Sequence, residues 1–344
     1  MGLLGIPFNV AGTFVNGAAF LAALVVLHRW VAAERGEAAA KWSVMVLAWC
    51  PFSLYGTVIY TEGLFLFLTV AALFCFDRGQ YRWAGLWGAM ATATRLPGLA
   101  LIPAFLWVTW RQQRGLKALA AALFSGWGVA IFSLYCWLRF GQPLAYLIEQ
   151  QDWTRPGDVR GQMWLKQLAQ VAIGPENWDK GALVNLSHPL LVVLILGLAG
   201  LGWQVRRWQV RRWLSQAQLR PSSDPAPLFA SEMGLYGLAI ALWLVAGNPL
   251  INTLMVLGGS FLLWNQRKRL NPLALAYGVF GFLIIYGTGR TMSVERYAYG
   301  IITLAPALGL VFARYPRWGY GTLVFFGLLL ATYSLKFAQE FWVA

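Results

Sequence analysis

Three short stretches of the sequence place charged residues beside hydroxyl or aromatic side chains at the ends of apolar runs. Tyr60 and Glu62 occupy a turn between two apolar segments, and Arg95 precedes a Leu-Pro-Gly break. Residues 287–297 end in Glu-Arg-Tyr, with Arg296 next to the following apolar segment. Arginine side chains bind phosphate or carboxylate oxygens as a fork, and a carboxylate can accept a proton. Together, the stretches predict an outward-facing cavity that fits either a lipid-linked phosphate substrate or the pore of a transporter for an anion.

Each stretch also has a purely structural explanation. Glu62 can be an acid in a solvated turn, Arg95 can form a salt bridge or extend to the membrane surface, and Glu295 can neutralise Arg296. A charged group costs about 2.5–3.5 kcal/mol at the centre of a membrane. Glu62 is therefore expected to face a polar cavity or a cationic partner such as Arg95.

The composition predicts which solvent surrounds these residues. Apolar residues make up 59% of the 344 residues and charged residues 12%, against about 45–50% and 25% in soluble domains. The mean hydropathy is +0.57. The apolar runs lack the two-residue alternation of a membrane β-barrel. We expect an all-α, polytopic transmembrane protein.

Apolar stretches divide the chain into about twelve membrane segments. The pair that flanks residues 95–98 reads as two half-helices, and residues 139–187 form one long outer loop with short helices on the membrane surface. A Pro- and Ser-rich linker at 221–227 separates a predicted N-terminal bundle, 1–220, from C-terminal helices, 228–344. The predicted segments are 10–28, 43–59, 63–76, 83–94, 98–110, 118–138, 188–205, 230–247, 250–265, 272–288, 298–313 and 319–338.

The net charge of +14 is concentrated on alternate loops. These loops hold 18 of the 27 Lys and Arg residues but only five of the 13 acids. Basic residues favour cytoplasmic loops, so the charge indicates orientation and not a nucleic-acid partner. Both termini then lie outside, which predicts a missing helix before residue 1. The basic loops are 28–41, 77–82, 111–117, 206–232, 267–269 and 314–317.

Cysteine and histidine give no sign of a metal, a cofactor or a disulfide framework. Cys50, Cys75 and Cys136 fall inside apolar segments without a C-x-x-C pair. His28 and His188 are predicted on opposite faces of the membrane, so they cannot share a metal ion.

Several strings, in this order, resemble the GPI mannosyltransferase II (PIG-V) family. The resemblance covers most of the chain from about residue 10. It rests on residues 51–55 (Pro-Phe-Ser-Leu-Tyr), 60–65 (Tyr-Thr-Glu-Gly-Leu-Phe), 93–98 (Ala-Thr-Arg-Leu-Pro-Gly), 141–146 (Gly-Gln-Pro-Leu-Ala-Tyr), 151–155 (Gln-Asp-Trp-Thr-Arg) and 295–297 (Glu-Arg-Tyr).

The resemblance implies a superfamily-C (GT-C) glycosyltransferase on the non-cytoplasmic face. Such an enzyme transfers mannose with inversion from a polyprenyl- or dolichyl-phosphate donor to a glycan, lipid or protein acceptor. A carboxylate takes the acceptor proton while the lipid phosphate departs. The resemblance gives Glu62 a supporting catalytic role and assigns substrate binding to Tyr60, Arg95, Asp152, Trp153, Arg155 and Arg296.

One departure from the family pattern leaves alternatives open. The family has its key acid in a first outer loop, whereas no acid here precedes Glu34, which is predicted in a cytoplasmic loop. The chain then either continues upstream or is an inactive truncated homologue.

A multi-pass transporter or flippase for a lipid-linked or anionic substrate is the second function class, although no internal repeat supports it. The abundance of Trp and Arg favours a bacterial inner membrane over the endoplasmic reticulum, with membrane lipids as partners.

Overall fold

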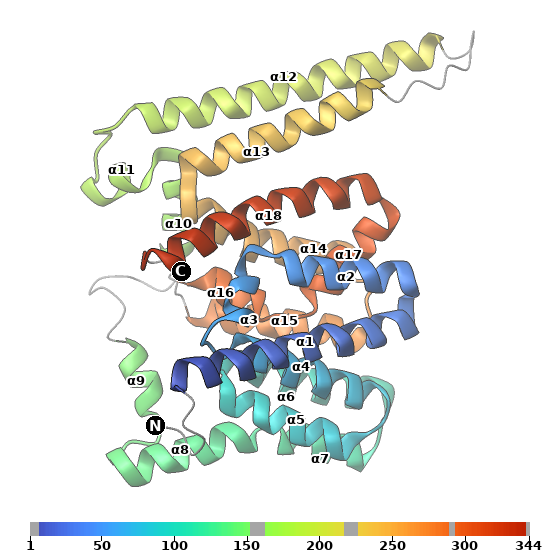
Figure 1. Cartoon of the computed structure of the whole chain (residues 1–344), viewed down its shortest axis with the longest axis vertical. Coiled ribbons are helices and arrows are strands. Elements are labelled where there is room, and N and C mark those ends of the chain that lie inside the picture. Colours follow the sequence, from blue (N-terminus) through green and yellow to red (C-terminus); the bar gives the residue numbers. More distant parts are fainter. Residues whose placement is uncertain (1–6, 152–161, 217–225, 289–292, 342–344) are drawn as a thin grey trace. The chain divides into compact units, whose positions relative to one another are not determined.

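The computed structural model describes residues 7–151, 162–216, 226–288 and 293–341, and these residues form helices without a strand (Figure 1). Their packing divides the chain into two compact units. Residues 1–160 and 255–344 form one, and residues 161–254 form the other. The divide predicted at 221–227 falls within the second unit, largely outside the described residues, and remains a prediction.

The first unit combines helices from both ends of the chain. In Figure 1 the blue helices α1, α2 and α4 lie among the orange helices α15 and α17. Its elements are α1 (Phe8–Arg35), α2 (Glu37–Trp49), η1 (Pro51–Ser53), α3 (Leu54–Thr57), α4 (Glu62–Asp77), α5 (Tyr81–Thr94), η2 (Leu96–Ala100), α6 (Leu101–Gln112), α7 (Leu116–Phe124), α8 (Trp127–Phe140), α9 (Ala145–Gln151), α14 (Gly259–Gln266), α15 (Pro272–Thr288), α16 (Val294–Tyr299), α17 (Leu304–Arg314) and α18 (Pro316–Ala338).

Helix α4 forms the centre of the first unit. Twelve of its 16 residues are buried, and it packs against α1 and α5. Most of these residues are apolar, so the helix is hydrophobic on every side, as expected for a helix surrounded by other helices. Glu62 at one end and Asp77 at the other are the acids that it brings into the unit.

The second unit contains a long helical hairpin. Helices α12 (Ser187–Gln216) and α13 (Ala226–Thr253) lie side by side, and shorter helices α10 (Gln162–Ile173) and α11 (Pro175–Lys180) precede them (Figure 1). The described part of residues 139–187 thus contains the expected short helices, and its place on the outer side of the membrane remains a prediction. Much of the predicted loop 206–232 is helical instead. Helix α13 is interrupted at Gly247, where φ is 60°, and it continues into the π-helical turn η3 (Leu254–Gly258).

The predicted twelve membrane segments are not confirmed. Among the described residues, four helices are long and apolar enough to span a membrane: Phe8–Arg35, Leu116–Phe140, Tyr236–Gln266 and Pro316–Ala338. A fifth span results if the pair Pro51–Thr57 and Glu62–Asp77, bent by 95°, counts as one. Helices of 12–14 residues such as α5 and α6 reach about 20 Å, short of the roughly 30 Å hydrocarbon core. The four to five long apolar helices indicate an integral membrane protein.

Candidate functional site

The turn before α4 holds Glu62 at the first position of that helix. Asn16 of α1 fixes this turn: its Nδ2 donates to the carbonyl oxygens of Tyr55 and Val58, both at 2.8 Å. Its Oδ1 accepts the backbone N–H of Leu64 at 3.1 Å. That N–H belongs to the first turn of α4, where helical partners are absent. The Asn16 side chain therefore caps α4 from a neighbouring helix.

A glycine allows this close approach of α1. A Cβ on Gly63 would collide with the backbone oxygen of Asn16 and lie 2.9 Å from that of Gly56. Only glycine lacks the Cβ that would force these backbones apart. In the Glu62-Gly63 pair of this turn, the packing against α1 thus requires the glycine, and the glutamate supplies the carboxylate of the site.

Two arginines from distant elements contact the same oxygen of Glu62. Arg95 lies in the break between α5 and η2, and its Nη1 is 2.5 Å from Glu62 Oε1. Arg296 of α16 donates to that oxygen from Nη2 at 2.6 Å and from Nε at 3.1 Å. The two guanidinium groups therefore have nitrogen atoms within about 5 Å of each other. The Glu62 side chain is 1% exposed, whereas those of Arg95 and Arg296 are 14% and 15% exposed.

Tyrosine rings surround the arginine pair. The Arg296 guanidinium carbon is 4.3 Å from the centre of the Tyr55 ring and 4.7 Å from that of Tyr60. Arg95 lies 5.6 Å from the Tyr297 ring centre. The negative face of an aromatic ring stabilises a nearby cation. The rings thus help to hold the two cations close together.

The cluster carries more positive than negative charge. Glu295, beside Arg296 in sequence, is buried, and burial raises its pKa to about 7 against the opposing effects of its own backbone N–H and Arg296. Below pH 7 it is mainly neutral, so Glu62 alone balances two arginines and leaves a net charge of +1. The expectation that Glu295 can neutralise Arg296 is not met. The ion-pair partner of Arg296 in the described structure is Glu62.

A cavity of about 280 Å³ opens beside Arg95. Aromatic side chains from three helices line it, together with hydroxyl and aliphatic groups. Pockets that bind small molecules combine such apolar walls with a few polar groups that fix orientation. The lining residues are Thr92, Ala93, Thr94, Arg95 and Leu96 from α5 and η2, Val129 and Phe132 from α8, Tyr146 from α9 and Tyr297 from α16.

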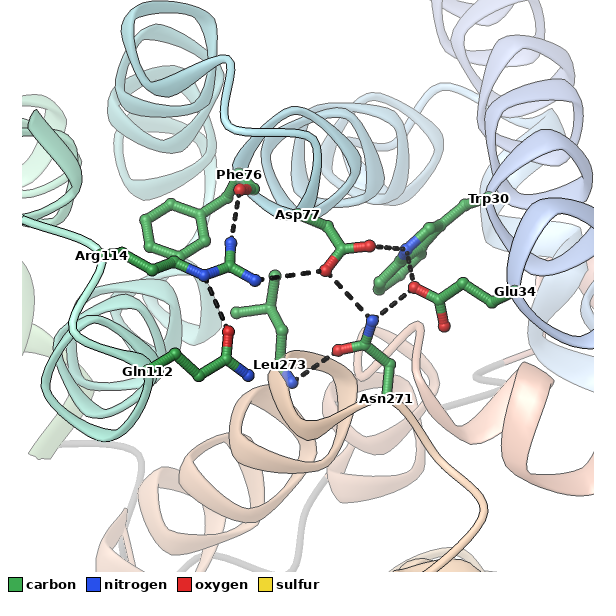
Figure 2. Close-up of polar contacts among 8 residues, drawn as sticks. All are labelled: Trp30, Glu34, Phe76, Asp77, Gln112, Arg114, Asn271 and Leu273. Atoms are coloured by element: carbon green, nitrogen blue, oxygen red, sulfur yellow. Dashed lines mark hydrogen bonds and ion pairs between the residues drawn. The ribbon is translucent and has the colours of Figure 1, made fainter.

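A second polar cluster surrounds the far end of α4 (Figure 2). Trp30 Nε1 donates to Glu34 Oε1 at 2.8 Å and to Asp77 Oδ2 at 3.3 Å. Asn271 Nδ2 lies between the carboxylates and donates to both, at 3.1 Å to Asp77 Oδ1. Arg114 Nη2 is 3.7 Å from that same oxygen of Asp77. The cluster joins α1, α4, the α6–α7 turn and the start of α15.

The second cluster serves to hold helices together and offers little space for a ligand. The adjacent cavity measures about 20 Å³, which is room for about one water molecule. The 16 residues of α4 extend about 24 Å, so this cluster and the Glu62 cluster lie at opposite ends of the helix. Glu34, predicted in a loop, lies in the last turn of α1 and takes part in this packing.

The structure brings four of the predicted site residues together: Tyr60, Glu62, Arg95 and Arg296. Asp152, Trp153 and Arg155 lie outside the described residues. Tyr55 and Tyr297 were not predicted as site residues, although both belong to the strings quoted above. Within the described ranges, no group of three or more His, Cys, Asp or Glu residues could hold a metal ion.

No family model, curated protein or solved structure matches this chain.

Proposed function

We propose that this chain is an integral-membrane glycosyltransferase that transfers mannose from a polyprenyl-phosphate donor to an acceptor on the non-cytoplasmic face. The observation that carries the proposal is the arginine pair, Arg95 and Arg296, held on one oxygen of Glu62 beside an aromatic-lined cavity. The PIG-V resemblance of the strings that contain these residues supplies the reaction type and the sugar.

The charge of the cluster matches the donor. A sugar linked to a polyprenyl phosphate is a phosphodiester with one negative charge. The cluster has a surplus of one positive charge while Glu295 is protonated. Arginines fixed before the substrate arrives can stabilise the phosphate that develops as the sugar leaves, without reorganising during the reaction.

The reaction assigns distinct roles to the acid and the cations. The acceptor hydroxyl oxygen forms a bond to the anomeric carbon, the bond from that carbon to the phosphate oxygen breaks, and the electron pair leaves with the phosphate. The resemblance implies that the acceptor proton passes to a carboxylate of the first outer loop, a role that is assigned here to none of the described residues. Oε1 of Glu62 is already in contact with both arginines. Its role is to hold Arg95 and Arg296 at the phosphate.

The neighbouring helix α8 offers a path for a lipid-linked substrate. Phe132 lines the cavity and is 43% exposed, and Ile131, Tyr135 and Leu138 on the same helix are also exposed. Leu116–Phe140 is one of the candidate membrane spans. An apolar polyprenyl chain can lie along this exposed surface while its phosphate reaches Arg95.

A transfer assay tests this proposal: labelled polyprenyl-phosphate mannose is supplied to membranes that contain the protein. Label should move to an acceptor in these membranes and not in membranes without the protein. Arg95→Lys and Arg296→Lys keep the charge opposite Glu62 but lose the guanidinium fork. We expect each to lower transfer by about 10²–10³-fold, the typical cost of one lost donor to a developing anion.

Arg317→Lys at the exposed start of α18 is the matched control and should leave transfer unchanged. Full transfer by both site variants would contradict the site assignment. Movement of intact donor across the membrane without transfer would instead establish the flippase alternative.

A further inference from the structure

A second, more apolar cavity lies between α14 and α15, on different residues from the proposed glycosyltransferase site. It measures about 310 Å³, within the range of ligand pockets. Its rim is open: Trp264, Val279 and Leu283 line it and are 65%, 43% and 55% exposed. At one end, the hydroxyls of Ser260 and Tyr286 lie 3.1 Å apart and satisfy each other. The groove between these ends is suited to an apolar chain.

The other end of this groove is basic. Arg267 lines it, and Lys268 and Arg269 follow in the exposed turn between the two helices. The Arg267 guanidinium is held over the Trp264 ring at 4.1 Å, with Nη1 donating to the Trp264 carbonyl at 2.7 Å. Across the described part of the chain, no carboxylate pairs with Arg267, so its charge is available to an anion. The remaining N–H groups of its planar fork can bind phosphate oxygens.

The length of the groove matches one leaflet of a membrane. The lining residues of α15 run from Leu275 to Tyr286, which corresponds to about 16 Å along a helix. Half of a roughly 30 Å hydrocarbon core is about 15 Å. A chain that starts beside Arg267 would thus end near the bilayer midplane, where the Ser260–Tyr286 pair closes the groove.

We propose that this groove binds an anionic phospholipid, with one acyl chain between α14 and α15 and the phosphate at Arg267. The apolar lining accounts for the acyl chain, the exposed rim allows entry from the membrane, and Arg267, with exposed Lys268 next to it, selects a negative headgroup. Basic side chains near a membrane surface each favour anionic lipids by about 1 kcal/mol, which corresponds to roughly fivefold in affinity.

Native mass spectrometry of the purified full chain, titrated with phosphatidylglycerol or phosphatidylcholine, tests the site. The unaltered protein should retain one phosphatidylglycerol at concentrations where phosphatidylcholine is lost. Arg267→Gln should weaken phosphatidylglycerol binding about fivefold, and the same change at exposed Arg317 should not. Val279→Phe fills the groove without changing charge and should weaken both lipids by about tenfold, whereas Val324→Phe on the exposed side of α18 should not.

Two results would overturn the site. One is equal retention of the two lipids by the unaltered protein. The other is a Val279→Phe variant that binds both lipids like Val324→Phe. A change from dimer to monomer in Val279→Phe, with lipid retention unaltered, would assign the groove to a second copy of the chain and would also reject the lipid.

Discussion

At the scale of single residues, burial decides how the two acids near Arg296 behave. Glu62 is buried but held by two guanidinium groups, which supply the opposite charge that a buried carboxylate needs. Glu295 is also buried, and Oε2 of each acid lacks a hydrogen-bond partner in the described structure, but Glu295 forms no ion pair there. Desolvation therefore raises the pKa of Glu295 to about 7. Glu295 therefore keeps its proton to a higher pH than an exposed glutamate does.

The raised pKa of Glu295 makes the stability of the protein fall with rising pH. An unfolded chain loses this proton near pH 4.5, whereas the folded chain keeps it until about pH 7. The contribution of the group is therefore most favourable below pH 4.5 and is lost as the pH rises to about 7. Glu295→Gln mimics the neutral form and should stabilise the protein at pH 8 by up to about 3 kcal/mol.

Thermal unfolding in detergent at pH 5 and pH 8 measures this effect. The difference between Glu295→Gln and the unaltered protein should be much larger at pH 8 than at pH 5. The exposed Glu149→Gln on α9 is the matched control. An equal difference at both pH values would show that the Glu295 carboxyl group is not neutral in the folded protein.

At the scale of elements, α1 supports the site without contributing a charged group to it. Asn16 is 2% exposed and uses its side-chain amide to join α1, α3 and α4. This cross-helix cap fixes the direction in which α4 begins, and Glu62 is the first residue of that helix. The position of the carboxylate therefore depends on a residue 46 positions earlier in the sequence.

Asn16→Ala should loosen the start of α4. The change leaves two carbonyl oxygens and one N–H without their partner, and a buried unsatisfied group costs about 1–3 kcal/mol. Partial rearrangement of the turn reduces this sum, so we expect a destabilisation of about 2–4 kcal/mol. Thermal unfolding gives the stability. Asn9→Ala, at the exposed start of α1, removes one local hydrogen bond and should have little effect. Similar melting of the two variants would refute the capping role.

At the scale of the whole molecule, the first unit places its polar groups at the two ends of a buried central helix. The arginine pair and Glu62 lie at the start of α4, and the Glu34–Asp77 cluster lies at its end. The basic turn 267–269 is close in sequence to Asn271 of the second cluster. Because charge asymmetry between loops orients membrane helices, we expect that turn on the cytoplasmic side and the loop after α8 on the other.

Cysteine labelling tests this sidedness. Cys50, Cys75 and Cys136 are buried and should give a low background with a membrane-impermeant thiol reagent. Lys268→Cys should react only from the cytoplasmic side, and Leu144→Cys, exposed before α9, only from the opposite side. A membrane-permeant reagent should label both and serves as the control. Labelling of both positions from one side would reject the predicted orientation.

The sequence alone determined the helical membrane class and selected residues that the fold brings together. Composition was sufficient for the class because a chain with 12% charged residues cannot cover a soluble surface. The strings around Tyr60, Glu62, Arg95 and Arg296 could be identified because a charged side chain beside an apolar run is costly if it enters the membrane core. The break after Arg95 was also predictable, because proline and glycine interrupt helices.

Tertiary structure decided which of these residues meet and how long the individual apolar helices are. Glu62 and Arg296 are 234 residues apart in sequence, so their pairing follows from the packing of α16 near α4 and not from local spacing. Asn16 showed no sequence signal because its partners are backbone groups of a different element. The twelve predicted membrane segments are not confirmed, since hydropathy cannot distinguish contact with lipid from contact with other helices.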